Sequence, residues 1–285
     1  MTAIAAGILT LVAAFGAVGV NTLRGPMGWS TADHTPAALA ATLAPYYRTV
    51  IPETGDGPFP TALLFSGCDG PKDNLGFLAH ALAEAGWASI VIDSHGPRDY
   101  GKYEAWRLIC SGQLLTGAER AGDVAVAIDE ARAMEFVDGD RIALIGASHG
   151  GWAIFDFLAL ASSGRVPPIL ESWPDSLARD GLSGIESVVA LYPYCGALSI
   201  AGREGWSADV PALFLLVEGD SIADDRDCLD LAAKEQALGA EVEVGTFRGV
   251  THGFDQAQKS ALSTLEFNAD ARIAAVREIV SFLDR

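Results

Sequence analysis

Positively charged residues are scarce in this sequence of 285 residues. It has 19 lysines and arginines against 37 aspartates and glutamates, which gives a formal net charge of -18 at pH 7. A surface of this sign repels phosphate backbones and anionic lipid headgroups, so we expect no nucleic-acid partner. Excess acidic residues also keep a protein soluble, and that explanation of the charge is sufficient here.

Cysteine is also scarce, and none of the four cysteines belongs to a C-x-x-C pair. A structural zinc site is therefore not expected. Cys195 follows one predicted strand and Cys228 lies just beyond the next, which favours their pairing and leaves Cys68 with Cys110. Two disulfides would require an oxidising compartment, and four reduced, partly buried thiols are the alternative.

Charged side chains are missing altogether between Met1 and Leu23, and Ala3–Val20 is apolar apart from Thr10. As a helix, this apolar stretch would span about 27 Å, close to the ~30 Å hydrocarbon thickness of a bilayer. It lacks the basic region that begins a secretory signal. We predict that residues 1–24 are an anchor or signal-like segment of a protein of the cell envelope, either periplasmic or membrane-anchored. A buried N-terminal helix in a cytoplasmic protein is the alternative.

The rest of the chain has an ordinary globular composition and no internal repeat. Residues 25–44 contain proline and glycine and are predicted to be a linker, followed by one domain over residues 45–285. Short apolar runs predict six strands, at Ala62–Phe65, Ala88–Ile92, Ile142–Ile145, Ile185–Tyr192, Ala212–Val217 and Val242–Phe247. Helical patterns follow them at Leu75–Ala85, Glu119–Met134, Trp152–Ala161, Asp227–Leu238 and Ala269–Leu283. This alternation predicts an α/β fold, with a mainly parallel sheet and helices on both faces.

One connection is unusually long. Residues 164–184 separate a predicted helix from the next strand and contain three prolines and Trp173. We expect this segment to form a lid or pocket wall across the site, and an incidental surface insertion is the alternative.

The pattern Gly146-x-Ser148-x-Gly150 lies between a predicted strand and a predicted helix. This strand-turn-helix setting is typical of the nucleophile elbow, in which small neighbours allow close approach around a strained serine. A serine hydroxyl needs a base to accept its proton, and histidine is suited to that near neutral pH. His252 is the one histidine in a loop downstream of the predicted elbow. We therefore predict Ser148 as nucleophile and His252 as base.

The third member of such a triad is an acid that orients the imidazole. It should follow the strand Ala212–Val217, where Asp220 is nearest the strand end and is favoured, with Asp224 or Asp225 next. The negative charge of a tetrahedral intermediate needs backbone donors. We predict that these are the amides of His149 and Cys68.

Several motifs in this order resemble the dienelactone hydrolase family of the α/β-hydrolase superfamily. They are "LLFSGCDGPKDN", "ASIVIDSHGPRDYG", "RIALIGASHGG", "YPYC", "GDSIADDRDC" and "THGFD". The resemblance runs from about Pro45 to the end of the chain. It implies the triad Ser148, Asp220 and His252, and it supports Asp220 through its spacing to Cys228.

The sequence departs from that family at three positions. Dienelactone hydrolases use a cysteine where this chain has Ser148, a glutamate where it has Gly67, and a substrate-binding arginine where it has Gln256. These changes argue against a dienelactone that carries a carboxylate. Arg98 and Trp173 are predicted to line the substrate pocket, with a structural role as the alternative for each.

The sequence thus predicts a serine hydrolase that cleaves a small-molecule carboxylic ester or related acyl bond through an acyl-enzyme, without metal or cofactor. The alternatives are a peptidase or acyltransferase with the same triad, and an inactive binding protein that has kept the fold.

Overall fold

A seven-stranded sheet forms the centre of the chain in this computed structural model, which describes residues 2–24, 27, 29, 32–260 and 263–285. The strand order is β1-β3-β2-β4-β5-β6-β7, and all neighbours are parallel except β1, which is antiparallel to β3. The strands are β1 (Arg48–Val50), β2 (Phe59–Phe65), β3 (Ala88–Ile92), β4 (Val137–Ala147), β5 (Ile185–Leu191), β6 (Ala212–Val217) and β7 (Val242–Phe247).

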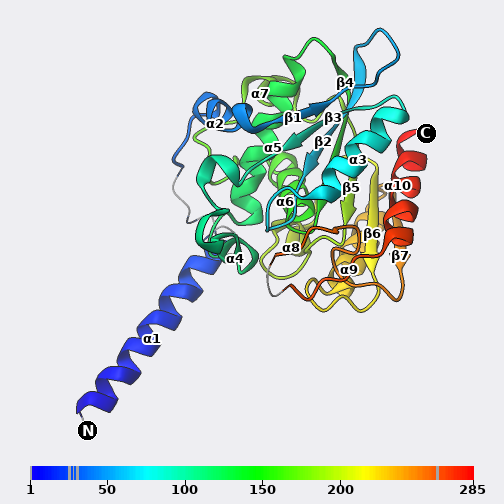
Figure 1. The fold of residues 1–285 in the computed structure, drawn as a ribbon. Helices are drawn as coiled ribbons and strands as arrows, with labels where there is room; N and C mark the ends of the chain where they lie inside the picture. The colour runs from blue at the N-terminus through cyan, green and yellow to red at the C-terminus, as the bar shows by residue number, and fades with distance from the viewer. Residues whose placement is uncertain (1, 25–26, 28, 30–31, 261–262) are drawn as a thin grey trace.

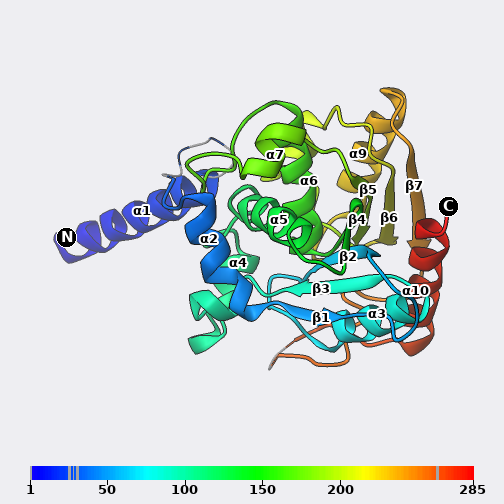
Figure 2. The same cartoon turned by 90° about the horizontal axis from the view of Figure 1, so that it is seen from above.

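Helices cover both faces of the sheet (Figures 1 and 2). One face carries α3 (Asp73–Glu84) and α10 (Ala269–Leu283). The other carries α2 (Pro36–Leu43), α5 (Gly117–Arg132), α6 (His149–Ser162), α7 (Asp175–Asp180), α8 (Ile200–Glu204) and α9 (Asp225–Ala237). Every residue of β3 and of β6 is buried, because these strands pack against helices on both sides. The predicted α/β fold is confirmed.

The apolar N-terminal segment forms the helix α1 (Thr2–Leu23), which extends away from the sheet in both views (Figures 1 and 2). Several of its large apolar side chains are exposed, and Phe15 is 74% accessible. Its C-terminal end contacts the body of the protein, where Arg24 forms a salt bridge at 2.8 Å with Glu119 of α5. Within the part of the chain that the structure describes, no helix is long and apolar enough to cross a membrane. The envelope location stays a prediction.

The prediction of a linker over residues 25–44 is wrong for its second half, because Pro36–Leu43 form the helix α2. Thr35 caps α2, and the side chains of Leu39 and Leu43 are fully buried in the core. Alanine-rich α2 lacks the long hydrophobic periodicity that reveals a helix in a sequence, which is why it reads as a linker. Positions 1, 25, 26, 28, 30 and 31 of the two N-terminal segments lie outside the described residues.

Both predicted cysteine pairings are present as disulfides. Cys68, in the loop after β2, is bonded to Cys110 at the end of the short helix α4 (Trp106–Cys110). Cys195, after β5, is bonded to Cys228 in α9. Each bond joins a loop at the carboxyl ends of the strands to a helix, so the rim of the sheet is cross-linked at two places. Disulfides of this kind are typical of an oxidising compartment.

Candidate active site

The turn between β4 and α6 places Ser148 at the carboxyl edge of the sheet. Ser148 has φ 51° and ψ -113°, which is a strained conformation for a residue with a side chain. Its amide donates a hydrogen bond of 2.8 Å to the carbonyl of Leu191, at the end of β5. The strained conformation of Ser148 is therefore stabilised by a hydrogen bond to β5 as well as by the turn itself.

Two glycines allow this turn to form. A Cβ atom on Gly146 would lie 2.4 Å from the backbone of Gly150 and Gly151. A Cβ atom on Gly150 would lie 2.3 Å from the carbonyl oxygen of Phe65 in β2. Both distances are shorter than any real carbon contact, so α6 can approach the sheet this closely only where side chains are absent.

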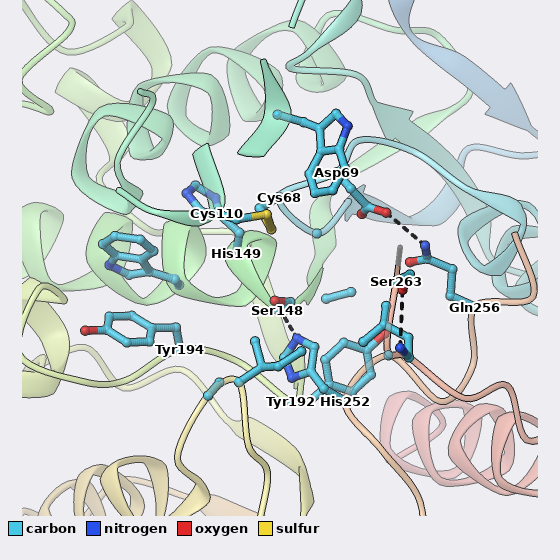
Figure 3. A pocket seen from close by; sticks show the side chains of 18 of the residues that line it. Cys68, Asp69, Cys110, Ser148, His149, Tyr192, Tyr194, His252, Gln256 and Ser263 are labelled. Carbon is cyan, nitrogen blue, oxygen red and sulfur yellow. Dashed lines mark hydrogen bonds between the residues drawn. A yellow bond between two sulfur atoms is a disulfide. The ribbon is translucent and has the colours of Figure 1, made fainter. Parts of the chain in front are cut away.

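Three loops bring Ser148, His252 and Asp220 together. Figure 3 shows the side chains of Ser148 and His252 directed toward one another. Ser148 Oγ lies 2.8 Å from His252 Nε2, and His252 Nδ1 lies 2.6 Å from Asp220 Oδ2. Both distances fit a relay in which the serine hydroxyl donates to the imidazole and the imidazole N–H donates to the carboxylate. The three residues follow β4, β7 and β6, so the arrangement depends on the parallel order of these strands.

The surroundings of Asp220 favour its ionised form. Burial raises the pKa of Asp220, but hydrogen bonds from His252 and from the amides of Ile222 and Ala223 outweigh burial and bring the pKa below its ordinary value. The other acidic candidates have different partners. Asp224 caps α9 and pairs with Arg226, while Asp225 accepts a hydrogen bond from the amide of Gly219. Asp220 is thus the acid that contacts His252.

Tyr192 supports the imidazole of His252 from the side. The two rings meet edge to face with centroids 4.7 Å apart. The hydroxyl of Tyr192 donates to the buried carboxylate of Asp255, which also accepts a bond of 3.1 Å from Asn74. Burial raises the pKa of Asp255. This role was not predicted from the sequence, although Tyr192 and Asp255 belong to the motifs "YPYC" and "THGFD".

The two predicted oxyanion donors, Cys68 and His149, both line the pocket in front of Ser148. Neither backbone amide has an acceptor among the described residues, so both are available to a ligand. His149 begins α6, and the positive end of that helix dipole also favours negative charge at this place. Their role as oxyanion donors stays a prediction.

A fully buried arginine lies behind these donors. Arg120 of α5 donates to the carbonyl of Ser66 at 2.7 Å, to the hydroxyl groups of Ser66 and Ser94 at 3.1 Å, and it lies 3.2 Å from His149 Nδ1. Burial lowers the pKa of Arg120 to about 10. This side chain joins the loop after β2 to the first residue of α6. A charged residue within a helical pattern is normally expected to be solvent-exposed, so the sequence did not indicate that Arg120 is buried next to the site.

Two histidines next to Arg120 are held neutral. Burial, and then the charge of Arg120, lower the pKa of His95 to about 3 and bring that of His149 well below its ordinary value. His95 Nε2 donates to the carbonyl of Cys68 at 2.9 Å. This bond, like those from Arg120, fixes the loop after β2.

The pocket in front of Ser148 has a volume of about 410 Å³ and is mainly apolar. Its apolar wall comes chiefly from Trp106, Trp152, Tyr194, Leu198, Ile222 and Leu265, together with the Cys68–Cys110 disulfide. Trp152 and Tyr194 are in contact, with ring centroids 4.9 Å apart. Among the described residues, no group of three or more His, Cys, Asp or Glu side chains is arranged to hold a metal ion.

Arg98 and Trp173 are not among the described residues that line this pocket, contrary to the sequence prediction. The guanidinium of Arg98 forms a bidentate pair with the buried carboxylate of Asp123, at 2.7 and 2.9 Å. Trp173 packs edge to face against Phe157 of α6. The predicted lid, residues 164–184, also contributes nothing to the described lining. Its Leu170 and Leu177 are buried in the core, so the segment packs against the helical layer instead.

Comparisons with known proteins place the chain among hydrolase folds. Residues 74–162, less than half of the chain, match the prolyl oligopeptidase family. Dipeptidyl-peptidase 5 from Porphyromonas gingivalis is 35% identical over 74 residues, which cover 26% of this chain and 10% of that protein. The chain thus spans about a tenth of that relative. Protein usf from Aquifex pyrophilus is 23% identical over 194 residues, which cover 66% of this chain and 72% of that protein.

Solved structures share the fold over most of the chain. A putative dienelactone hydrolase from Klebsiella pneumoniae has a TM-score of 0.61 at 15% identity, covering 84% of this chain and 92% of that one. A dienelactone hydrolase-like promiscuous phosphotriesterase from metagenomic libraries has a TM-score of 0.58 at 19% identity, covering 84% and 91%. Thermogutta terrifontis esterase 2, phosphonylated by sarin, has a TM-score of 0.59 at 15% identity, covering 83% and 88%. The chain therefore has the α/β-hydrolase fold that the sequence motifs predict.

The close approach at the elbow predicts a large effect of Gly150→Ala. The added methyl group has no space next to the Phe65 carbonyl, so we expect unfolding free energy to fall by about 2–3 kcal/mol. Gly76→Ala, at an exposed position of α3 where nothing lies within 4 Å, is the matched control and should be neutral or stabilising by up to about 1 kcal/mol. Urea unfolding followed by circular dichroism measures both. Equal effects of the two substitutions would contradict the steric account.

Because His95 and His149 are neutral in the folded protein, we expect the free energy of unfolding to fall at acidic pH. Between the ordinary pKa of 6.5 and the folded-state pKa of about 3, the unfolded chain binds a proton at His95 that the folded chain does not. Stability is therefore lost as the pH falls through this window, and His95 contributes a slope of up to about 1.4 kcal/mol per pH unit. His95→Gln should reduce this slope, whereas His80→Gln, at an exposed position, should not. Urea unfolding between pH 7 and pH 4 makes the comparison, and parallel slopes in both variants would rule it out.

Proposed function

We propose that this protein is a serine hydrolase that cleaves carboxylic esters of small molecules through an acyl-enzyme. The observation that carries the proposal is the hydrogen-bonded line from Ser148 through His252 to Asp220, which opens on a pocket of about 410 Å³. An apolar pocket of this size suits a small organic substrate. The shared fold with Thermogutta terrifontis esterase 2 and with dienelactone hydrolase-like proteins supports the same reading.

The proposed reaction has two halves. Ser148 Oγ attacks the ester carbonyl carbon while His252 Nε2 accepts the hydroxyl proton, and Asp220 stabilises the imidazolium that forms. The carbonyl oxygen becomes negatively charged and accepts hydrogen bonds from the amides of Cys68 and His149. Collapse of this intermediate breaks the bond to the alcohol, which leaves with the proton from His252.

Water completes the reaction. His252 accepts a proton from the water molecule, whose oxygen attacks the carbonyl carbon of the acyl-enzyme. The second intermediate collapses, Ser148 Oγ leaves and takes back the proton, and the carboxylic acid is released. Each step needs a positioned donor or acceptor, which in this proposal are the triad side chains and the two backbone amides, and no external oxidant or reductant is required.

Covalent labelling tests the nucleophile. We expect an alkyl fluorophosphonate to label the wild-type protein at Ser148, because the activated hydroxyl displaces fluoride from phosphorus. Labelling should disappear in Ser148→Ala and persist in Ser163→Ala, an exposed serine outside the pocket. Intact mass and peptide mapping locate the label, and a folded but unlabelled wild-type protein would defeat the proposal in favour of a binding role.

Asp220→Asn should lower kcat for ester hydrolysis by about 10⁴-fold, since the imidazole loses its correct tautomer.

A peptidase is the second candidate, because residues 74–162 match the prolyl oligopeptidase family and a dipeptidyl-peptidase matches the chain over 74 residues. A panel of p-nitrophenyl esters of rising chain length, run beside dipeptide p-nitroanilides, separates the two. We expect turnover of the esters, with Ser148→Ala inactive on every substrate. Turnover of the anilides alone would instead establish the peptidase.

A further inference from the structure

The pocket contains one acidic side chain among its described lining residues, and that residue is Asp69. It lies in the loop after β2, directly after Cys68, and is half-buried. Figure 3 shows its carboxylate directed toward Gln256 on the side of the pocket opposite Tyr194. The rest of the lining is mainly apolar, so this carboxylate dominates the local charge on its side of the cavity.

Gln256 fixes the position of that carboxylate. Its side-chain amide donates to Asp69 Oδ2 at 2.9 Å and to the carbonyl of Gln258 at 2.8 Å. Gln256 is itself 6% exposed. Both amide hydrogens are therefore used, and the buried glutamine holds Asp69 without neutralising its charge.

The second carboxylate oxygen borders the nucleophile. A Cβ atom built on Gly67 would lie 3.5 Å from Asp69 Oδ1 and 3.7 Å from Ser148 Cβ. The carboxylate and Ser148 thus face the same small space, which Gly67 leaves open. Among the described residues, no side chain or amide donates a hydrogen bond to Oδ1, so its lone pairs are available to a ligand.

Among the described lining residues, the one arginine or lysine forms its salt bridge with a residue other than Asp69. Arg107 forms a salt bridge of 2.8 Å with Glu104, and its guanidinium lies 4.5 Å from the ring centroid of Trp106. The chain also carries a net charge of -18, which repels anions and attracts cations over longer distances. In a mainly apolar pocket, a fixed carboxylate favours a positively charged group and opposes a negatively charged one.

We propose that Asp69, positioned by Gln256, determines the specificity of the pocket by selecting substrates that carry a positive charge close to the scissile carbonyl. This inference rests on the proposed esterase function and names its substrate class: small cationic esters, such as those with an ammonium group. Substrates that carry a carboxylate at that place are rejected.

Two pairs of isosteric esters test the proposal, because each pair differs in charge and hardly in shape. The first pair places the charge on the acyl side, with p-nitrophenyl esters of trimethylammoniobutanoate and of its tert-butyl analogue. The second places it on the alcohol side, with acetylcholine and the acetate in which a tert-butyl group replaces trimethylammonium. We expect kcat/KM of the wild-type protein to favour the cationic ester by about tenfold or more in at least one pair.

Variants assign that preference to the carboxylate. In Asp69→Asn the preference should fall to within about threefold of equality, and in Gln256→Arg it should vanish or invert, because a guanidinium then neutralises Asp69. The matched control is Asp99→Asn, which removes the same charge from an exposed position and should keep the wild-type preference. If Asp69→Asn does not fold, Gln256→Arg gives the answer by itself.

The outcomes separate this inference from the function on which it rests. Turnover of the neutral esters with no charge preference in either pair, or a preference that survives in both pocket variants, overturns the role of Asp69 and leaves the esterase intact. Absence of turnover of all four esters, together with absence of fluorophosphonate labelling at Ser148, overturns the proposed function itself.

Discussion

The site depends on how closely α6 approaches the sheet. Gly150 lies against the Phe65 carbonyl and Gly146 against the backbone of α6, at distances that allow no side chain on either residue. This contact forces the chain through a tight turn, and Ser148 takes up the strain as a positive φ. The exposed hydroxyl, the free amide of His149 and the direction of the helix dipole all result from that one steric constraint.

The remaining groups are held by contacts from several elements. His252 is oriented by Asp220 on one nitrogen and packed by Tyr192 on its face, while Asp255 anchors Tyr192 in turn. On the opposite side, Arg120 and His95 fix the loop that carries Cys68. A site built this way is preorganised, because each group that would contact a substrate has a buried neighbour that fixes its position.

The sequence predicts the parts of this structure that have a strong local pattern. All six predicted strands are present, because buried parallel strands are continuous apolar runs, and the elbow is visible because its glycines are sterically required. The short edge strand β1 and the alanine-rich helix α2 have weak patterns and were not predicted. Arg120, Tyr192 and Asp255 were missed, and Arg98 and Trp173 were misplaced, for one reason. A side chain's partner depends on tertiary packing, and no spacing rule shows that Arg98 faces Asp123 rather than the pocket.

The disulfide between Cys68 and Cys110 shows how one position can combine two independent tasks. The backbone at position 68 is predicted to direct its N–H group to the pocket, which any residue except proline could do, while the sulfur bonds the loop to α4. The disulfide can therefore be lost or replaced during evolution while the backbone N–H group at position 68 is kept. Related chains should gain or lose the cysteines at 68 and 110 as a pair, and their α4 segments should diverge most where the bond is missing.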